Sequence, residues 1–321
     1  MKGLTPDQLQ ATGAELVLAN AYHLFLRPGQ ELIARRGGLH RFMGWNGPIL
    51  TDSGGYQVFS LSHLTKVDDD GASFQSIIDG STKRLTPEST LELQRDLGPD
   101  IAMVLDECPA GTAAPEVVRR ATERTLAWAR RARDLHDSWG GANARGQAVF
   151  GIVQGGNDPE LRSHCATELT AMEFDGYAIG GLSVGETKRQ MEVALEASVA
   201  LLPKHKLRYL MGVGTPADFR TAVRAGVDLF DCVTPTRHGR NNQAFTREGR
   251  LKMRNLVHAE DDRPLDEACS CYTCRTFSRA YLRHLAVAGE MLAGTLLSIH
   301  NIHYFQDIMA ELRAEATHPV P

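Results

Sequence analysis

Three of the six cysteines in this 321-residue chain fall within six positions, at Cys269, Cys271 and Cys274. Thiolates at this spacing are typical ligands of a tetrahedral zinc site. Clustered cysteines in a chain without secretion signals bind metal more often than they form disulfides. The spacing therefore predicts one metal ion, with a histidine as the expected fourth ligand.

The sequence offers three histidines downstream of these cysteines. His284 lies inside a helical pattern, whereas His300 and His303 lie at the expected start of another helix. Spacing alone does not choose between His300 and His303. Three thiolates and one imidazole leave no position open for water, so a site of this kind is predicted to be structural.

A second set of polar residues comes directly after short apolar runs that are typical of buried parallel strands. A lone aspartate in such a place commonly caps the next helix, but a whole set of caps is the weaker explanation. In an α/β barrel the chemistry is carried where the strands end. The set comprises Asp52, Asp106, Gln154, Gly180, Gly181, Gly212, Gly214 and Asp231.

Asp52 and Asp231 follow strands that are far apart in the sequence. A pair of carboxylates, one a nucleophile and one an acid/base, is how retaining glycosyl transfer is done. After Asp52, Gly54 and Gly55 allow a close backbone approach, and Tyr56 offers a ring for stacking. We expect Asp106 to accept hydrogen bonds from a guanine-like edge, with Gln154 and Gly180-Gly181 reading the other edge.

The chain is basic directly after Asp231, although its net charge is −4. Six Lys or Arg residues and one acid, Glu248, lie between positions 237 and 254. Such a run is more often a solvated face, but its place after a candidate nucleophile favours phosphate contact.

Seven apolar runs alternate with capped helical patterns, which predicts an α/β fold of the (β/α)8 TIM-barrel type. Helix starts are indicated at Thr86-Pro87, Ala114-Pro115 and Thr215-Pro216, and a β-hairpin at 71–85. No GxGxxG follows the first run, which disfavours a dinucleotide-binding sheet. The runs are 15–20, 48–52, 100–107, 148–154, 176–181, 207–214 and 227–233.

The count is one strand short of a barrel, because the chain opens on a helix signal at Thr5-Pro6. The expected domains are a catalytic core at 1–235, a zinc-binding subdomain at 236–305 and a C-terminal helix closing the barrel at 306–321. Composition is that of a soluble globular protein, 42% hydrophobic and 23% charged. With no apolar run long enough to span a membrane and no signal-peptide pattern, the cytoplasm is the expected compartment.

The chain resembles the bacterial tRNA-guanine transglycosylase family, also called queuine tRNA-ribosyltransferases, over essentially its whole length. The resemblance rests on specific motifs: LANAYHLFLRPG, GWNGPILTDSGGYQVFSL, GGLSVGE, YLMGVGTPAD, GVDLFDCVTPTRHGRNNQAFT, and CSCYTC with HN at 300–301. It implies a TIM barrel with a zinc-binding subdomain near the C-terminus. It also implies an N-terminal segment with the first barrel strand, which this chain lacks.

The resemblance implies a role for each matching position. Asp231 is the nucleophile that attacks C1′ of the wobble ribose, and Asp52 is the general acid/base. Cys269, Cys271, Cys274 and His300 are the zinc ligands. The base pocket comprises Asp52, Ser53, Gly54, Gly55, Tyr56, Asp106, Cys108, Gln154, Gly180, Gly181, Leu182 and Met211. The tRNA contacts comprise Gly212, Val213, Gly214, Thr215, Pro216, Ala217, Asp218, Thr236, Arg237, His238, Gly239 and Arg240.

The implied reaction exchanges guanine in tRNAs with a G-U-N anticodon for preQ1, through a covalent ribosyl-enzyme, in a homodimer. Val184 and the motif at 106–108 favour preQ1 over queuine. Two positions depart from the family: Asn242 stands where glycine is usual, and His238 where serine is frequent.

A non-catalytic tRNA-binding partner subunit is the alternative, and retention of both Asp52 and Asp231 disfavours it. An unrelated zinc hydrolase would need histidines at the strand ends.

Overall fold

The computed structural model describes residues 2–61, 65–142 and 146–317. These residues form two compact units, one of residues 16–213 and 221–231, the other of residues 2–15, 214–220 and 232–317. We call them the sheet unit and the cysteine unit. The domain division expected from the sequence stays a prediction.

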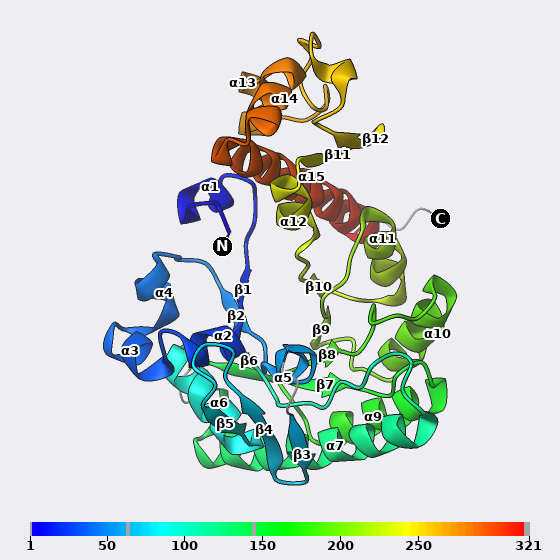
Figure 1. The fold of residues 1–321 in the computed structure, drawn as a ribbon. Helices are drawn as coiled ribbons and strands as arrows, with labels where there is room; N and C mark the ends of the chain where they lie inside the picture. Colours follow the sequence, from blue (N-terminus) through cyan, green and yellow to red (C-terminus); the bar gives the residue numbers. More distant parts are fainter. Residues whose placement is uncertain (1, 62–64, 143–145, 318–321) are drawn as a thin grey trace. The chain divides into compact units, whose positions relative to one another are not determined.

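The sheet unit is built on seven parallel strands in the order β1-β2-β6-β7-β8-β9-β10. They curl as in a barrel, with helices on the outside (Figure 1). Among the described residues, β1 and β10 each pair with one strand only. All seven strands fall within the seven apolar runs, as β1 Val17–Ala19, β2 Ile49–Thr51, β6 Ile101–Met103, β7 Ala148–Val153, β8 Gly176–Ile179, β9 Leu207–Leu210 and β10 Leu229–Phe230.

The helices of this unit begin where the sequence places their caps. The Thr86 hydroxyl accepts from the amide of Ser89 at the start of α6, and Pro115 opens α7 after Ala114. The helices are α2 Ala21–Leu26, α3 Gln30–Arg35, α4 Gly38–Met43, α5 Gly55–Leu61, α6 Pro87–Leu97, α7 Pro115–Ser138, α9 Pro159–Ala171 and α10 Lys188–Val199, with α11 Pro216–Ala225 shared between the units.

The core of the sheet unit lies between the strands and their helices. Successive strands pair in register, as in Phe150 opposite Gly176 and Val153 opposite Ile179. Leu50, Ala102, Phe150, Ile152 and Tyr209 are all at most 1% exposed. Burial on both faces explains why these strands are continuously apolar.

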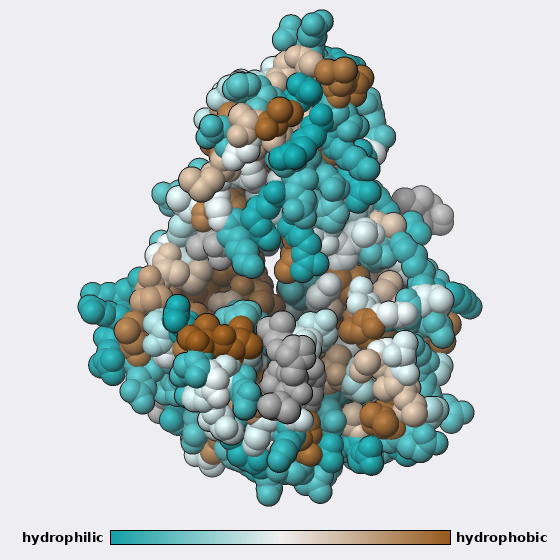
Figure 2. Space-filling model, in the orientation of Figure 1, coloured by the Kyte–Doolittle hydropathy of each residue, from teal (hydrophilic) through white to brown (hydrophobic). Residues whose placement is uncertain are grey.

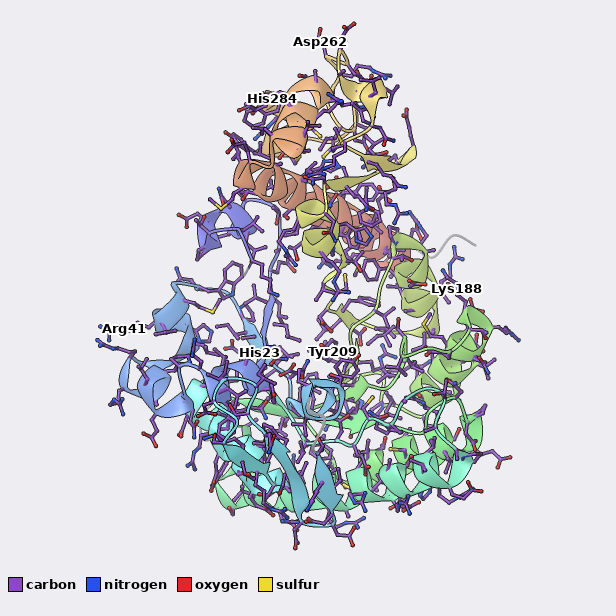
Figure 3. All side chains as sticks on the ribbon, in the orientation of Figure 1. His23, Arg41, Lys188, Tyr209, Asp262 and His284 are labelled. Atoms are coloured by element: carbon purple, nitrogen blue, oxygen red, sulfur yellow. The ribbon has the colours of Figure 1, made fainter. Side chains whose placement is uncertain are left out.

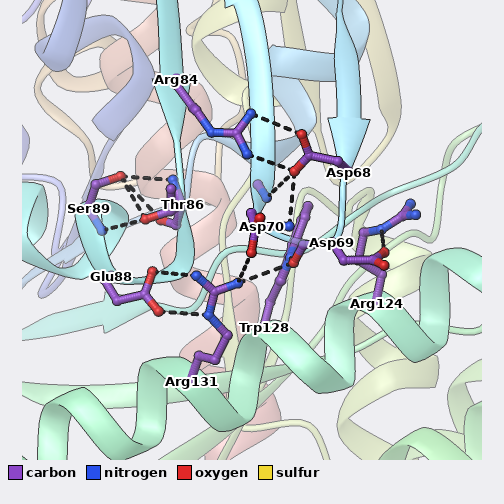
Figure 4. Close-up of polar contacts among 11 residues, drawn as sticks. Asp68, Asp69, Asp70, Arg84, Thr86, Glu88, Ser89, Arg124, Trp128 and Arg131 are labelled. Atoms are coloured by element: carbon purple, nitrogen blue, oxygen red, sulfur yellow. Dashed lines mark hydrogen bonds and ion pairs between the residues drawn. The ribbon is translucent and has the colours of Figure 1, made fainter.

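The predicted hairpin is present and belongs to a three-stranded antiparallel sheet of β3 Lys66–Asp68, β4 Gly71–Gln75 and β5 Thr82–Leu85. Figure 4 shows how its strands and α7 are joined. Arg84 binds Asp68 through Nη2 at 2.7 Å and Nη1 at 3.1 Å. Trp128 of α7 donates its indole N–H to the carbonyl of Asp69 at 2.8 Å, which pins the β3–β4 turn to the helix.

The cysteine unit contains α1 Pro6–Gln10, α12 Thr234–Arg240, the hairpin β11 Gln243–Thr246 and β12 Gly249–Lys252, the 3-10 turn η1 Leu256–His258, and helices α13 Tyr272–Thr276, α14 Arg279–Ala288 and α15 Met291–Thr317. Its own apolar core includes Ala244, Met253, Leu282 and Leu297. Asn242 has φ 57°, a left-handed conformation that asparagine tolerates and glycine adopts freely.

One helix boundary was predicted wrongly. His300 and His303 were expected at the start of a helix, but α15 begins nine residues before His300, at Met291. The surfaces of both units are mainly hydrophilic on the face drawn in Figure 2, with apolar side chains in small groups. None of the helices described is both long and apolar enough to cross a membrane.

Candidate active site and metal centre

Asp52 follows β2, at the point where the chain turns towards α5. Its Oδ1 accepts a 2.8 Å hydrogen bond from the amide of Ala21, and its Oδ2 accepts one from the Asn20 side chain. Asn20 follows β1 and caps α2, so the ends of two adjacent strands hold this carboxylate. The pKa of Asp52 is raised to about 7. Burial is the largest cause, and the charges of Asp231 and Asp106 contribute to the same rise.

Asp231 follows β10 and is held through one oxygen. The Tyr209 hydroxyl donates to Oδ1 at 2.5 Å, and the amide of Gly212 donates to the same oxygen at 2.7 Å. Burial raises the pKa of Asp231, and these two donors lower it. Burial and the charge of Asp231 raise the pKa of Tyr209 well above 10, so the phenol stays a donor. Figure 3 shows Tyr209 within the curve of the sheet.

Asp106 links two other strand ends. Its Oδ1 accepts from the Ser53 hydroxyl at 2.9 Å, and its Oδ2 accepts from Nε2 of Gln154 at 2.7 Å. Asp106 is 5% exposed and Gln154 is 1% exposed, and burial raises the pKa of the aspartate. Oε1 of Gln154 is buried and has no donor among the described residues. A buried amide with one unused oxygen is suited to a ligand N–H.

Glycines allow the turns around this network to pack closely. A Cβ on Gly55 would lie 2.7 Å from the carbonyl oxygen of Asp106, and one on Gly54 would lie 3.0 Å from Tyr22. A Cβ on Gly181 would lie 2.3 Å from Oε1 of Gln154, and one on Gly180 would lie 2.7 Å from Ile152.

The structure places the remaining residues of the predicted base pocket as follows. Cys108 is buried, and its burial together with the charge of Asp106 raises the pKa of the thiol to about 12. Leu182 is 4% exposed, Met211 follows β9 and packs against the core, and Tyr56 is 54% exposed. Ser53 and Gln154 both bond Asp106, and the charge of Asp106 helps to raise the pKa of Asp52. No hydrogen bond among the described residues links Tyr56 to this group.

The predicted tRNA contacts are divided between the units. Gly212 and Val213 belong to the sheet unit, where Gly212 holds Asp231. Residues 214–218 and 236–240 belong to the cysteine unit. There Thr215 and Asp218 bond each other at the start of α11, and α12 carries the exposed Arg237 and Arg240.

Two residues of the basic segment at 237–254, His238 and Arg247, have contacts within the cysteine unit. His238 Nδ1 lies 3.0 Å from the carbonyl of Thr234, and its Nε2 lies 3.4 Å from Nη1 of Arg250. Arg247 lies within 3.7 Å of carboxylates of Asp266, Asp307 and Glu311. Arg247 is therefore held by carboxylates of its own unit, whereas Arg237 and Arg240 are exposed.

The three clustered cysteines and His300 form one group. Nδ1 of His300 lies 3.6 Å from Sγ of Cys269, 3.6 Å from Sγ of Cys271 and 3.3 Å from Sγ of Cys274. Zinc bonds of about 2.3 Å to sulfur and 2.0–2.1 Å to nitrogen imply N···S edges of about 3.5 Å in a tetrahedron. The three N···S distances therefore match those of a tetrahedral metal site, and all four donor atoms lie within 4.8 Å of one another.

His303 lies outside this group, although it forms a smaller one with Cys269 and Asp307. Its Nε2 lies 3.2 Å from the hydroxyl of Ser270. His300, in contrast, is fully buried, and its Nε2 bonds the carbonyl of Phe245 at 2.7 Å. A carbonyl on the second ring nitrogen is the usual way to orient a metal-bound histidine. The geometry therefore selects His300, which spacing could not do.

Three residues that bond the predicted site residues or their backbone were missed by the sequence interpretation: Asn20, Tyr209 and Arg162. Asn20 ends an apolar run, so the strand-end rule that identified Asp52 would have found it. Tyr209 lies inside a strand and carries no such signal. Arg162 lies in α9, where a helical pattern gives no sign that an arginine is buried.

Comparisons with known proteins agree with this arrangement. A family model described as "Queuine tRNA-ribosyltransferase" matches residues 1–317. The queuine tRNA-ribosyltransferase of Novosphingobium aromaticivorans is 54% identical over 314 residues, which cover 98% of this chain and 84% of the relative. The proteins of that name from Oleidesulfovibrio alaskensis and Lawsonia intracellularis are 52% and 54% identical and are each covered to 82%. The chain belongs to this family.

Proposed function

We propose that this member of the queuine tRNA-ribosyltransferase family exchanges guanine for preQ1 at the wobble position of tRNAs with a G-U-N anticodon. These are the tRNAs for Asp, Asn, His and Tyr, and the step belongs to queuosine biosynthesis. The observation that carries the proposal is the carboxylate pair, in which the charge of Asp231 helps to raise the pKa of Asp52 to about 7. A carboxyl group with this pKa can both give and accept a proton at neutral pH.

In the first displacement, the Asp231 carboxylate attacks C1′ of the nucleotide-34 ribose and the bond from C1′ to N9 breaks. Protonated Asp52 gives its proton to the departing guanine. The hydrogen bonds from Tyr209 and Gly212 go to Oδ1 of Asp231, so Oδ2 is the oxygen that we assign to the attack. The product is a ribosyl ester of Asp231, which is the intermediate expected of a retaining mechanism.

In the second displacement, Asp52 removes the N9 proton of preQ1 and that nitrogen attacks C1′. The ester bond breaks and the Asp231 carboxylate is restored. Because the ester conserves the energy of the glycosidic bond, the exchange needs no nucleotide hydrolysis. Asp106 and Gln154 are suited to binding the donor edge of either base, and we assign Tyr56 and Met211 to its two faces.

We assign the group of three cysteines and His300 to one structural zinc ion. The N···S spacing near that of a zinc tetrahedron supports this assignment, as does the bond from His300 to Phe245. Asn301, the next residue, accepts from the amide of Phe245 and donates to the carbonyls of Pro235 and Gln243. The zinc would thus fix the segment that carries Arg237 and Arg240, which we assign to the tRNA backbone.

We further propose that the protein acts in the cytoplasm, where its tRNA substrate is found, and as a homodimer, as the resemblance to bacterial transglycosylases implies. Neither assignment enters the catalytic mechanism. The dimer is tested by the molar mass of the chain in solution.

The proposed function is tested by exchange of labelled guanine or preQ1 into tRNA with a G-U-N anticodon. We expect exchange with this chain and none with Asp231→Asn, because an amide does not form the ribosyl ester. Labelling at comparable rates by the parent and the variant would contradict the role of Asp231. Replacement of nucleotide 34 by adenine is the substrate control, and we expect it to abolish labelling.

A further inference from the structure

Arg162 is a fully buried arginine, at 0% exposure, on α9. Its guanidinium donates to four main-chain carbonyls. Nε bonds Gly156 at 2.8 Å, Nη1 bonds Val153 at 3.1 Å and Gly180 at 2.7 Å, and Nη2 bonds Gly181 at 3.3 Å. These carbonyls come from the last residue of β7 and from the loops after β7 and β8, which carry Gln154 and the Gly180-Gly181 turn.

The charge of Arg162 has no carboxylate within ion-pair distance in the part of the chain that the structure describes. A buried arginine is costly unless its donors are satisfied, and four of the five N–H donors here bond backbone oxygens. Burial lowers its pKa to about 10, so the guanidinium stays charged at neutral pH. The guanidinium is planar and its N–H donors point in fixed directions, so it can hold several carbonyls in one arrangement. The ammonium of a lysine lacks this fixed geometry.

The bonds to Gly180 and Gly181 determine where two N–H groups point. In a planar trans peptide the carbonyl and the N–H of one unit point in opposite directions. The bond to the Gly180 carbonyl therefore turns the N–H of Gly181 away from Arg162, and the bond to the Gly181 carbonyl does the same for Leu182. Neither N–H has an acceptor among the described residues.

Gly181, which carries the first of these donors, lies beside an unused acceptor. The site of a Cβ on Gly181 is 2.3 Å from Oε1 of Gln154, the buried oxygen that lacks a donor among the residues described. Nε2 of the same amide bonds Asp106. Free N–H groups, a free amide oxygen and a carboxylate are together complementary to a planar base that carries a carbonyl next to its own N–H groups, as guanine does.

We propose that Arg162 is a positioning residue for base selection, which orients the N–H groups of Gly181 and Leu182 towards the carbonyl of the bound base. The inference rests on the proposed function, since it takes residues 180–182 as part of the base pocket. It adds a physical reason for the direction of these two N–H groups, which is that the buried Arg162 binds the carbonyls of their peptide units.

The test compares guanine with 2-aminopurine, a purine of nearly the same shape without the carbonyl. Affinities of the tRNA-free chain for both bases are measured by calorimetric titration for the parent, Arg162→Lys and Arg162→Gln. Arg279→Lys is the matched control, because Arg279 is also buried and binds two carbonyls, those of Pro264 and Leu265, in the cysteine unit. The ratio of two affinities does not depend on the folded fraction of a preparation, so partial unfolding of a variant leaves the readout intact.

We expect the parent and Arg279→Lys to prefer guanine by the same factor. In both Arg162 variants the preference should fall on the order of tenfold, as expected from one or two misaligned hydrogen bonds. An equal loss of affinity for both bases, or no loss, would overturn the inference and leave the proposed function standing. Absence of guanine binding to the parent would contradict the proposed function, and the inference with it.

Discussion

The two aspartates that we assign to different tasks, Asp52 and Asp231, have different surroundings. Asp52 is more completely buried and feels the charge of Asp231, whereas Asp231 is stabilised as an anion by Tyr209 and Gly212. Separating the pKa values of two carboxyl groups is how a site assigns one as acid/base and the other as nucleophile. The sequence identified both residues from their positions after strands, but it could not show which neighbours adjust them.

The Tyr209 hydroxyl should matter most at low pH. The hydrogen bond from Tyr209 lowers the pKa of Asp231, so we expect Tyr209→Phe to raise that pKa. We expect the acid limb of the pH profile of kcat/KM to move to higher pH. Tyr177→Phe is the control, since Tyr177 is also buried and its hydroxyl lies 3.5 Å from a carbonyl on another part of the sheet unit. A loss of equal size at every pH would contradict this role.

Asp52 should also leave a signature in stability. Its folded pKa of about 7 lies above its ordinary 3.8, so between these values the folded chain binds the proton more tightly and stability falls as pH rises. Three pKa units correspond to about 4 kcal/mol as an upper bound. We expect Asp52→Asn to gain in melting temperature relative to the parent between pH 4 and pH 8. If the difference in melting temperature between Asp52→Asn and the parent stays constant from pH 4 to pH 8, burial does not raise the pKa of Asp52.

At the scale of elements, the sequence predicted all seven strands because burial on both faces makes each one continuously apolar. It predicted the starts of α6, α7 and α11 because Thr or Ala followed by Pro marks a first turn. It placed the start of the helix carrying His300 wrongly, because no cap residue precedes Met291. It also could not choose between two histidines three residues apart, since that choice depends on which face of α15 meets the cysteines.

Close packing of α12 on α15 is a further element-scale feature, because α12 carries the basic residues that we assign to tRNA. A Cβ on Gly239 would lie 2.5 Å from Oγ and 2.7 Å from N of Ser298. We expect Gly239→Ala to lower the free energy of unfolding by about 1–3 kcal/mol and to weaken tRNA binding. Calorimetric melting and a filter-binding titration measure the two effects.

Gly294→Ala is the matched control for this packing. Gly294 lies within α15, and the atom nearest to a Cβ added at this position would be Cα of Arg240 at 3.5 Å, an ordinary contact. We expect this variant to be neutral or to stabilise the chain by about 0.4–1 kcal/mol, because alanine restricts the unfolded chain. A cost as large as that of Gly239→Ala would contradict the close packing at Gly239.

At the scale of the whole molecule, each unit has its own apolar core, and among the described residues only the cysteine unit has a group of metal-ligating side chains. We expect about one zinc per chain, lost in His300→Ala and kept in His303→Ala. Elemental analysis measures the metal content. Loss of zinc from His303→Ala alone would assign the fourth ligand to His303 instead.

Removal of the metal should then affect one unit more than the other. We expect a chelator to speed hydrogen exchange of amides in residues 232–317, because a structural zinc contributes directly to folding. Amides of β6, β7 and β8 should keep their protection, since the core around them contains no ligand. Equal loss of protection in both units would contradict an independent core in the sheet unit.

A covalent bond between Asp231 and the tRNA ribose is the central claim. It is tested directly by mixing the chain with a G-U-N tRNA, removing the released guanine by filtration, and analysing the mixture on a denaturing gel. We predict a tRNA–protein band that maps by mass spectrometry to Asp231, disappears when guanine is added back, and is absent with Asp231→Asn. Label exchange without such a band, or a band on another residue, would contradict that claim.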